Sequence, residues 1–294
     1  MSQVKSLIRL MRPHQWLKNG FVFVGLLFGH AWEDPQRLVQ VLLAFAAFCL
    51  LASGVYVMND LIDREQDRQH PEKRHRPLAS GQVSVVAALW LLAGCFGGGL
   101  ALVLFSNNQA PWVFASYVVL NIGYTLGLKH VAVLDVFIIA AGFMLRILAG
   151  TSGVAIQPSY WLLLCSLMLT LFLGFAKRRA EAMALADGQA ASHRRVLEHY
   201  SPAMLDQFMT IASAAAIISY SLYTVSPETL AVHGTTHLIY SVPLVVYGMY
   251  RYLFLLHRQG EGGDPARLLL TDRHLLAAAG GWLLVVTAAL QHWL

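Results

Sequence analysis

The sequence predicts an all-helical (all-α) protein embedded in a membrane, and its composition and long apolar runs carry that prediction. Of the 294 residues, 57% are hydrophobic and only 13% are charged, and the mean hydropathy is +0.55. Charged residues make up about a quarter of a typical soluble domain. Apolar runs occur along almost the whole chain. A disordered or fibrous protein is therefore excluded, and we expect a single integral-membrane domain over residues 1–294.

Nine runs are apolar enough to cross a membrane as helices, which takes about 20 mostly apolar residues each. Turn-rich breaks such as Ser106-Asn107-Asn108 separate several of them. In chain order the runs cover about residues 19–32, 38–58, 83–105, 111–128, 131–149, 158–176, 205–225, 236–256 and 274–293. The predicted fold is therefore a polytopic bundle of about nine transmembrane helices.

The distribution of positive charge predicts the orientation of this bundle. Of the 21 Lys and Arg residues, 19 lie in the N-terminal stretch or in breaks on the same side of the membrane, whereas Arg37 lies on the opposite side and Arg146 inside a run. Cytoplasmic loops carry the excess of Lys and Arg. We therefore expect a protein of the inner (cytoplasmic) membrane with a cytoplasmic N-terminus and its long polar loops on the cytoplasmic face. The net charge of +5 follows from this bias and does not indicate nucleic-acid binding.

An acidic motif with the sequence NDLIDREQD directly follows the second run. Asp60, Asp63 and Asp67 are spaced so that a continuous helix would place them within about 60° of one another, and Asn59 lies one turn before Asp63. Neighbouring carboxylates repel unless a cation lies between them, and oxygen ligands suit Mg²⁺, with Mn²⁺ as an alternative. Asn59 and the three aspartates are the predicted metal ligands, and the aspartates are the predicted catalytic residues.

The segment after the acidic motif favours a substrate site over an ordinary helix end. The acids could simply pair with Arg64 and Arg68 in a solvated helix end. They lie at the end of a membrane run, however, and the basic stretch Lys73-Arg74-His75-Arg76 follows at once. Carboxylates for a metal beside cations for phosphate oxygens predict a diphosphate site. In that site Lys73, Arg74 and Arg76 are predicted to contact the substrate.

These stretches resemble the UbiA superfamily of intramembrane prenyltransferases. Residues 59–67 have the form NDxxDxxxD and are followed by HPEKRHRPLASG, residues 12–19 resemble the motif RPxQWxKN, and Tyr124 to Lys129 with Asp135 resembles the segment YxxxLK…D. The resemblance covers nearly the whole chain. It implies a bundle of nine spans that binds an allylic or related diphosphate through Mg²⁺, in a central cavity open to the cytoplasmic face.

Two further stretches narrow the resemblance to the decaprenyl-phosphate phosphoribosyltransferase branch. They are the KRRAE segment at residues 177–181 and the last polar loop, from Asp264 to Leu275. Enzymes of that branch move a 5-phosphoribosyl group from phosphoribosyl pyrophosphate to a polyprenyl phosphate and release pyrophosphate, a step in lipid-linked sugar biosynthesis for the cell envelope. The aromatic-prenylating branch usually has a second acidic motif where this chain has KRRAE, with Asp187 alone further on. We therefore predict a Mg²⁺-dependent phosphoribosyltransferase.

Other polar residues at the ends of the runs are predicted substrate contacts. Lys18 and Asn19 are interpreted as phosphate contacts, with anchoring at the membrane interface as the alternative. Tyr124 and Lys129 flank the fourth break, and Lys129 is interpreted as a phosphate ligand. Its alternative is a plain contribution to the cytoplasmic charge bias.

Ionisable residues inside or beside the runs give the remaining predictions. Arg146 lies well inside a run and is a candidate substrate contact, with an ion pair to another helix as the alternative. Asp135 is expected to be a partner of Lys129 or Arg146 rather than a metal ligand.

The KRRAE segment is expected to serve the second phosphate of the donor. Lys177 and Arg178 are predicted to bind that phosphate, and Glu181 is predicted to contact the metal or the ribose. The alternative is a pair of charges at a helix end.

Two other functions compete with phosphoribosyl transfer. An enzyme of the same fold could move a prenyl group from a prenyl diphosphate to an aromatic acceptor, although the missing second acidic motif disfavours it. A transporter is disfavoured because the two halves of the chain show no matching pair of interrupted helices.

Overall fold

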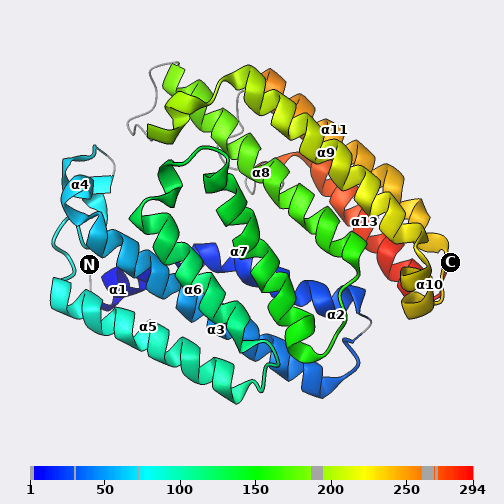
Figure 1. Cartoon of the computed structure of the whole chain (residues 1–294), viewed down its shortest axis with the longest axis horizontal. Coiled ribbons are helices and arrows are strands. Elements are labelled where there is room, and N and C mark those ends of the chain that lie inside the picture. Colours follow the sequence, from blue (N-terminus) through cyan, green and yellow to red (C-terminus); the bar gives the residue numbers. More distant parts are fainter. Residues whose placement is uncertain are drawn as a thin grey trace. The chain divides into compact units, whose positions relative to one another are not determined.

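The computed structural model describes residues 3–29, 31–71, 73–186, 195–259, 268 and 271–293, and all regular secondary structure within them is helical (Figure 1). The chain forms two compact units. The first contains Met1–Lys129 and Gly142–Gln157, and the second contains His130–Ala141 and Pro158–Leu294. The expectation of a single domain stays a prediction, and each unit is described by itself below.

Helices of two kinds build both units. The first unit is formed by α1 (Gln3–Met11), η1 (Pro13–Phe23), α2 (Val24–Phe28), α3 (Pro35–Ile62), α4 (Arg64–Gln69), η2 (Lys73–His75), α5 (Val85–Phe105), α6 (Pro111–Leu126), η3 (Leu128–His130), the second half of α7 (Leu134–Gly150) and η4 (Ser152–Val154). The second unit is formed by the first half of α7 and by α8 (Tyr160–Ala186), η5 (Arg195–His199), α9 (Pro202–Val225), α10 (Pro227–His233), η6 (His237–Ser241), α11 (Val242–Gln259) and α13 (Arg273–Leu290). The elements labelled η are 3₁₀ helices.

Four of the long helices begin at a capping side chain. Asp34 precedes α3, Ser84 precedes α5, Ser201 precedes α9 and Asp272 precedes α13. In each case a side-chain oxygen accepts a hydrogen bond from a backbone N–H of the first helical turn. Such caps satisfy backbone donors that have no partner within the helix. The polar breaks before these four helices therefore help to fix where they start.

Seven helical segments in the described part of the chain are long and apolar enough to cross a membrane. They are Pro35–Ile62, Val85–Phe105, Leu134–Val154, Tyr160–Met183, Pro202–Val225, His237–Arg258 and Arg273–Leu290. The other two predicted runs are also helical but shorter. The run at 111–128 forms α6, whose 16 residues span about 24 Å at 1.5 Å per residue, and the run at 19–32 forms the end of η1 and α2.

In the first unit, α3 packs along α5 and contacts η1 and α6 (Figure 1). Its core is aromatic near the middle of α3, where the ring of Phe48 lies 4.8 Å from that of Phe114 and 5.3 Å from that of Tyr117, between centroids. In the second unit, α8 packs along α9 (Figure 1). Phe172 of α8 is buried there against Tyr252 of α11.

A close backbone contact holds η1 and α2 against the end of α7 in the first unit. A Cβ atom on Gly150 would lie 1.7 Å from the carbonyl oxygen of Val22, and one on Gly25 would lie 1.9 Å from the carbonyl oxygen of Gly150. Real Cβ atoms essentially never come this close to another heavy atom. Only glycine therefore fits at both positions.

Gly150→Ala is expected to destabilise the folded protein by about 1–3 kcal/mol or more, because an inserted methyl group forces η1 away from α7. The measurement is thermal unfolding of the purified protein in detergent. Gly97→Ala is the matched control, since a Cβ on Gly97 meets no atom within 4 Å. Equal melting temperatures for the two variants would contradict the close packing.

The charge bias of the sequence also gives a topological expectation. A reporter fused after Leu294 should report the outside of the cytoplasmic membrane, and a reporter inserted near Gln189 should report the cytoplasm, because the apolar runs predict nine crossings, of which six precede Gln189. Position 189 lies outside the described residues. Paired alkaline phosphatase and green fluorescent protein fusions measure both positions, and a cytoplasmic C-terminus would mean an even number of crossings.

Candidate functional site

The acidic motif lies where α3 gives way to α4. Helix α3 ends at Ile62, Asp63 occupies a turn with φ −84° and ψ 3°, and α4 begins at Arg64. The helical hydrogen-bond spacing nevertheless continues across the turn: the N–H of Asp63 donates to the carbonyl of Asn59 (2.9 Å), and the N–H of Asp67 donates to that of Asp63 (2.8 Å). The four predicted metal ligands therefore stay within about two helical turns.

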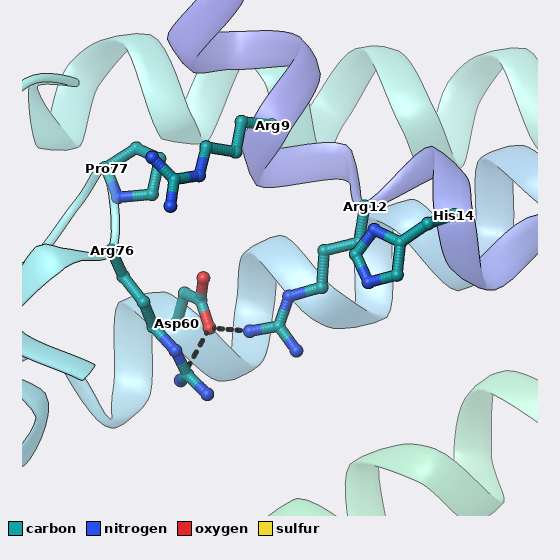
Figure 2. A pocket seen from close by; sticks show the side chains of 6 residues that line it. All are labelled: Arg9, Arg12, His14, Asp60, Arg76 and Pro77. Atoms are coloured by element: carbon teal, nitrogen blue, oxygen red, sulfur yellow. Dashed lines mark hydrogen bonds and ion pairs between the residues drawn. The ribbon is translucent and has the colours of Figure 1, made fainter. Parts of the chain in front are cut away.

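Two of the acids converge on a single cationic group. The Nη1 atom of Arg76 lies 3.1 Å from a carboxylate oxygen of Asp60 and 2.7 Å from one of Asp67. Arg12 binds the same Asp60 oxygen from the other side, at 2.5 Å (Figure 2). The side chains of both aspartates are at most 5% exposed. Burial of carboxylates is costly unless they are paired, so the two arginines act as their counter-ions.

The other two predicted metal ligands contact α6 and η3 instead. Asn59 accepts a hydrogen bond of 2.5 Å from the hydroxyl of Thr125, and Asp63 lies 3.6 Å from the Nζ atom of Lys129. The common face expected from helical spacing is therefore divided. Asp60 and Asp67 point to one place, whereas Asn59 and Asp63 have partners on the neighbouring segment.

Two carboxylates, rather than the three predicted, are placed together in a way that fits a bound Mg²⁺. Among the described residues, no three His, Cys, Asp or Glu side chains gather into a metal-binding group. Mg²⁺ is usually held by one or two carboxylates together with substrate phosphates. Asp60 and Asp67 meet this requirement, because their oxygens already face a common positive charge on Arg76.

A pocket of about 230 Å³ opens beside Asp60 (Figure 2). Its walls combine α1, the start of η1, the end of α3 and the loop after η2, and it is lined by Arg9, Arg12, His14, Asp60, Arg76 and Pro77. The predicted substrate residues did not include Arg9 or Arg12. Arg12 does belong to the motif RPxQWxKN, and its left-handed backbone (φ 54°, ψ 58°) ends α1 immediately before Pro13 starts η1.

The side chains predicted to bind phosphate in this unit differ in their exposure and in whether they reach the acids. Of the basic stretch, Arg76 reaches the acids, whereas Arg74 is exposed and Lys73 is half-buried on η2. Lys18 is exposed on η1, and Tyr124 is half-buried on α6. These side chains all belong to the first unit.

Asn19 and Arg146 form a buried polar network in the first unit. The Nε atom of Arg146 donates to the amide oxygen of Asn19 (2.8 Å), and its other nitrogens donate to the carbonyl of Gly142 (2.7 Å) and the hydroxyl of Tyr117 (3.2 Å). The guanidinium also lies 5.3 Å from the centre of the Phe48 ring. In the described part of the chain, the partners of Arg146 are thus neutral groups that link η1 to α7.

In the second unit, Arg178 is buried between two acids. Its side chain is 1% exposed, and it lies 2.6 Å from Asp135 and 2.6 Å from Glu181. The hydroxyl of Tyr200 donates to the second oxygen of Asp135 (2.8 Å). Burial, together with the nearby negative charge of Asp135, raises the pKa of Tyr200, so the hydroxyl stays protonated as a donor. The expectation that Asp135 pairs with Lys129 or Arg146 is therefore wrong, because packing of α8 against α7 supplies Arg178.

The remaining residues of the KRRAE segment and last loop are described in part. Lys177 is half-buried on α8, and Glu181 is 24% exposed and held by Arg178. Arg179 binds Asp206 of α9 at 2.5 Å. Asp187 and most of the predicted last loop, including Asp264, lie outside the described residues.

Comparison with known proteins identifies the family of this chain. Residues 20–279 match the model of the UbiA prenyltransferase family. The chain belongs to that family. A UbiA-family protein is a multi-pass membrane transferase, so the predicted recognition and the enzyme class are confirmed.

Two relatives that share one enzyme name match nearly the whole chain. It is 33% identical to a decaprenyl-phosphate phosphoribosyltransferase from Corynebacterium glutamicum, over 97% of this chain and 86% of the relative. It is also 33% identical to the protein of the same name from Mycolicibacterium smegmatis, over 98% of this chain and 93% of the relative.

A solved structure confirms the predicted fold. The chain resembles a UbiA homologue from Archaeoglobus fulgidus bound to GPP and Mg²⁺, with a TM-score of 0.71 over 97% of this chain and 99% of that one. At 18% identity this likeness shows the UbiA fold alone. The all-helical membrane bundle predicted from the apolar runs and the UbiA-like fold that the resemblance implied are therefore confirmed.

Proposed function

We propose that this UbiA-family enzyme transfers a 5-phosphoribosyl group from phosphoribosyl pyrophosphate to a polyprenyl phosphate and releases pyrophosphate. The observation that carries the proposal is the similarity, at 33% identity over nearly the full chain, to decaprenyl-phosphate phosphoribosyltransferases. The site supports it, because buried carboxylates and several arginines lie together at the end of α3. Such a site suits a donor that carries a diphosphate.

The proposed mechanism assigns a task to each part of the site. Asp60 and Asp67 would hold Mg²⁺, which supplies positive charge that stabilises the departing pyrophosphate. Arg12 and Arg76 already lie at these carboxylates and would bind phosphate oxygens beside them. The acceptor phosphate is an anion, so its oxygen can attack carbon 1 of the ribose without a strong general base. Pyrophosphate leaves from the same carbon as the new carbon–oxygen bond forms.

The other predicted substrate contacts remain part of the proposal. In the first unit, Lys18, Lys73, Arg74, Tyr124 and Lys129 are proposed to contact the diphosphate, and Asn59 and Asp63 to complete the surroundings of the metal. Asn19 and Arg146 are proposed to act by fixing η1.

In the second unit, Lys177 and Glu181 are proposed substrate contacts. Arg178 is proposed to hold Glu181 in place rather than to bind phosphate, because its side chain is 1% exposed and ion-paired. The charge bias of the sequence supports an active site on the cytoplasmic face of the membrane.

The competing function within the family is transfer of a prenyl group. It is favoured by one observation, namely that a solved relative of the same fold is bound to GPP, a prenyl diphosphate. The solved relative is only 18% identical, whereas the phosphoribosyltransferases are 33% identical over nearly the full chain. Phosphoribosyl transfer is therefore the better supported proposal.

A donor trial tests the proposal. Purified protein in detergent with Mg²⁺ and a short polyprenyl phosphate is expected to form a phosphoribosylated lipid from phosphoribosyl pyrophosphate, detected by mass spectrometry. The parallel reaction offers geranyl diphosphate with 4-hydroxybenzoate and should give no product. Prenylation of the aromatic acid without phosphoribosyl transfer would refute the proposal and would leave the membrane transferase assignment intact.

A further inference from the structure

The pocket beside Asp60 carries more positive charge than its carboxylate can neutralise. Three arginines, Arg9, Arg12 and Arg76, line it together with the single acid Asp60. Figure 2 shows the three guanidinium groups directed to the space around the Asp60 carboxylate. With the histidine neutral the lining has a net charge of +2, and Asp67, which binds Arg76 without lining the pocket, reduces the local sum to +1, so the pocket attracts an anion. A phosphate monoester carries about −1.5 to −2 at neutral pH.

The arginines of the pocket also have donors left for a ligand. A guanidinium has five N–H donors. Among the described contacts, Arg12 donates one hydrogen bond to Asp60, and Arg76 donates one to Asp60 and one to Asp67. Arg9 makes no described ion pair, is exposed on α1 and lines the pocket. The pocket that these side chains line has a volume of about 230 Å³, which is room for several waters at about 30 Å³ each and hence for the five heavy atoms of a phosphate group.

The proposed reaction requires a site of this kind. It brings together a diphosphate and two phosphate monoesters, one on carbon 5 of the ribose and one on the lipid. The sequence had suggested Arg178 for the second phosphate of the donor, but that side chain is enclosed between Asp135 and Glu181. A monoester needs other cations, because a phosphate that leaves water without partners is costly.

We propose that Arg9, Arg12, His14 and Arg76 form a binding site for a phosphate monoester, adjacent to the position where Asp60 and Asp67 converge. The inference rests on the proposed function only for the identity of the monoester. Both candidates, the 5-phosphate of the donor and the headgroup of a polyprenyl phosphate, present the same dianionic group.

Direct binding measurements test this site without any turnover. The probes are ribose 5-phosphate and farnesyl monophosphate, each compared with its unphosphorylated form, ribose or farnesol, by calorimetry on the full-length protein in detergent. Arg9→Ala and Arg12→Ala are expected to weaken binding of at least one phosphate by about ten- to a hundredfold, the size expected for one charge-assisted contact. Binding of the unphosphorylated forms should not change.

Lys5→Ala is the matched control, because Lys5 is an exposed cation on the same helix but does not line the pocket. Arg9→Ala keeps the test interpretable if Arg12→Ala impairs folding, since Arg12 also pairs with Asp60. A loss for ribose 5-phosphate alone assigns the site to the donor, and a loss for farnesyl phosphate alone assigns it to the acceptor. Unchanged binding of both phosphates to Arg9→Ala, or an equal loss in Lys5→Ala, would overturn the proposal.

The outcome is separable from that of the donor trial. Phosphoribosyl transfer by wild type, together with unchanged phosphate binding in Arg9→Ala, would refute the phosphate-binding site and leave the proposed function standing. Arginine-dependent binding of a phosphate in a protein that transfers only prenyl groups would support the phosphate-binding site and refute phosphoribosyl transfer.

Discussion

Asp67→Asn is expected to lower kcat by about a hundred- to a thousandfold. The side chains of Asp60 and Asp67 converge on one cationic group, and the asparagine would leave only one carboxylate at that place. A bound metal contributes several kcal/mol to stabilising a departing anion, and each 1.36 kcal/mol changes a rate tenfold. The measurement is steady-state kinetics over a range of Mg²⁺ concentrations.

Glu65→Gln is the matched control for that substitution. Glu65 lies on the same helix, α4, but its side chain is 71% exposed and pairs with Arg68, so its activity should stay near that of wild type. Thermal unfolding of Asp67→Asn checks that the variant still folds. We expect it to fold, because Arg76 keeps its ion pair with Asp60. Wild-type turnover in Asp67→Asn, or in wild type treated with EDTA, would show that the acids do not hold a metal.

Arg178→Ala is expected to destabilise the protein by about 3–5 kcal/mol. The substitution leaves Asp135, whose side chain is fully buried, with the Tyr200 hydroxyl as its described partner. Removal of one member of a buried ion pair typically costs this much, because a charge stays behind in a medium that solvates it poorly. The measurement is thermal or chemical unfolding of the purified protein in detergent.

Two further variants distinguish this structural role of Arg178 from a direct contact with substrate. Arg37→Ala breaks a pair with Asp34 in which both side chains are about 40% exposed, and it should cost less than about 1 kcal/mol. The double variant Asp135→Leu with Arg178→Met should be more stable than Arg178→Ala, because it also removes the fully buried charge of Asp135 and leaves only the partly exposed Glu181 without Arg178. An Arg178→Ala protein that melts like wild type but has a raised KM for phosphoribosyl pyrophosphate would instead restore the phosphate contact predicted from the sequence.

Local patterns in the sequence predicted the helices and part of the site. Apolar runs and turn-rich breaks predicted the helical segments, and the spacing of Asp60, Asp63 and Asp67 predicted acids at the membrane end of α3. The spacing could not show that the helix is interrupted at Asp63, because that turn keeps the helical hydrogen-bond pattern. Asp60 and Asp67 converge on Arg76, whereas Asp63 faces Lys129.

The partners of the charged residues come from distant parts of the chain and were harder to predict. Asp60 pairs with Arg12, which is 48 residues away, and Asp135 pairs with Arg178, which is 43 residues away. Helical periodicity describes neighbours along one helix and carries no information on which helix packs next to it. Arg9 and Arg12 were missed for the same reason, since only the packing of α1 against α3 brings them to the acids.

The 3₁₀ form of η1 changes which of its residues share a face. A 3₁₀ helix has three residues per turn, so side chains three apart are aligned, whereas an α-helix would rotate them by about 60° at each step. Trp16, Asn19 and Val22 follow this spacing. The Trp16 indole binds Ser53 of α3, and Asn19 and Val22 are both 0% exposed, while Leu17 between them is 72% exposed. On an α-helical wheel Val22 would lie about 120° from Trp16, so such a wheel would assign the buried Val22 to a different face from the one that it shares with Trp16 and Asn19.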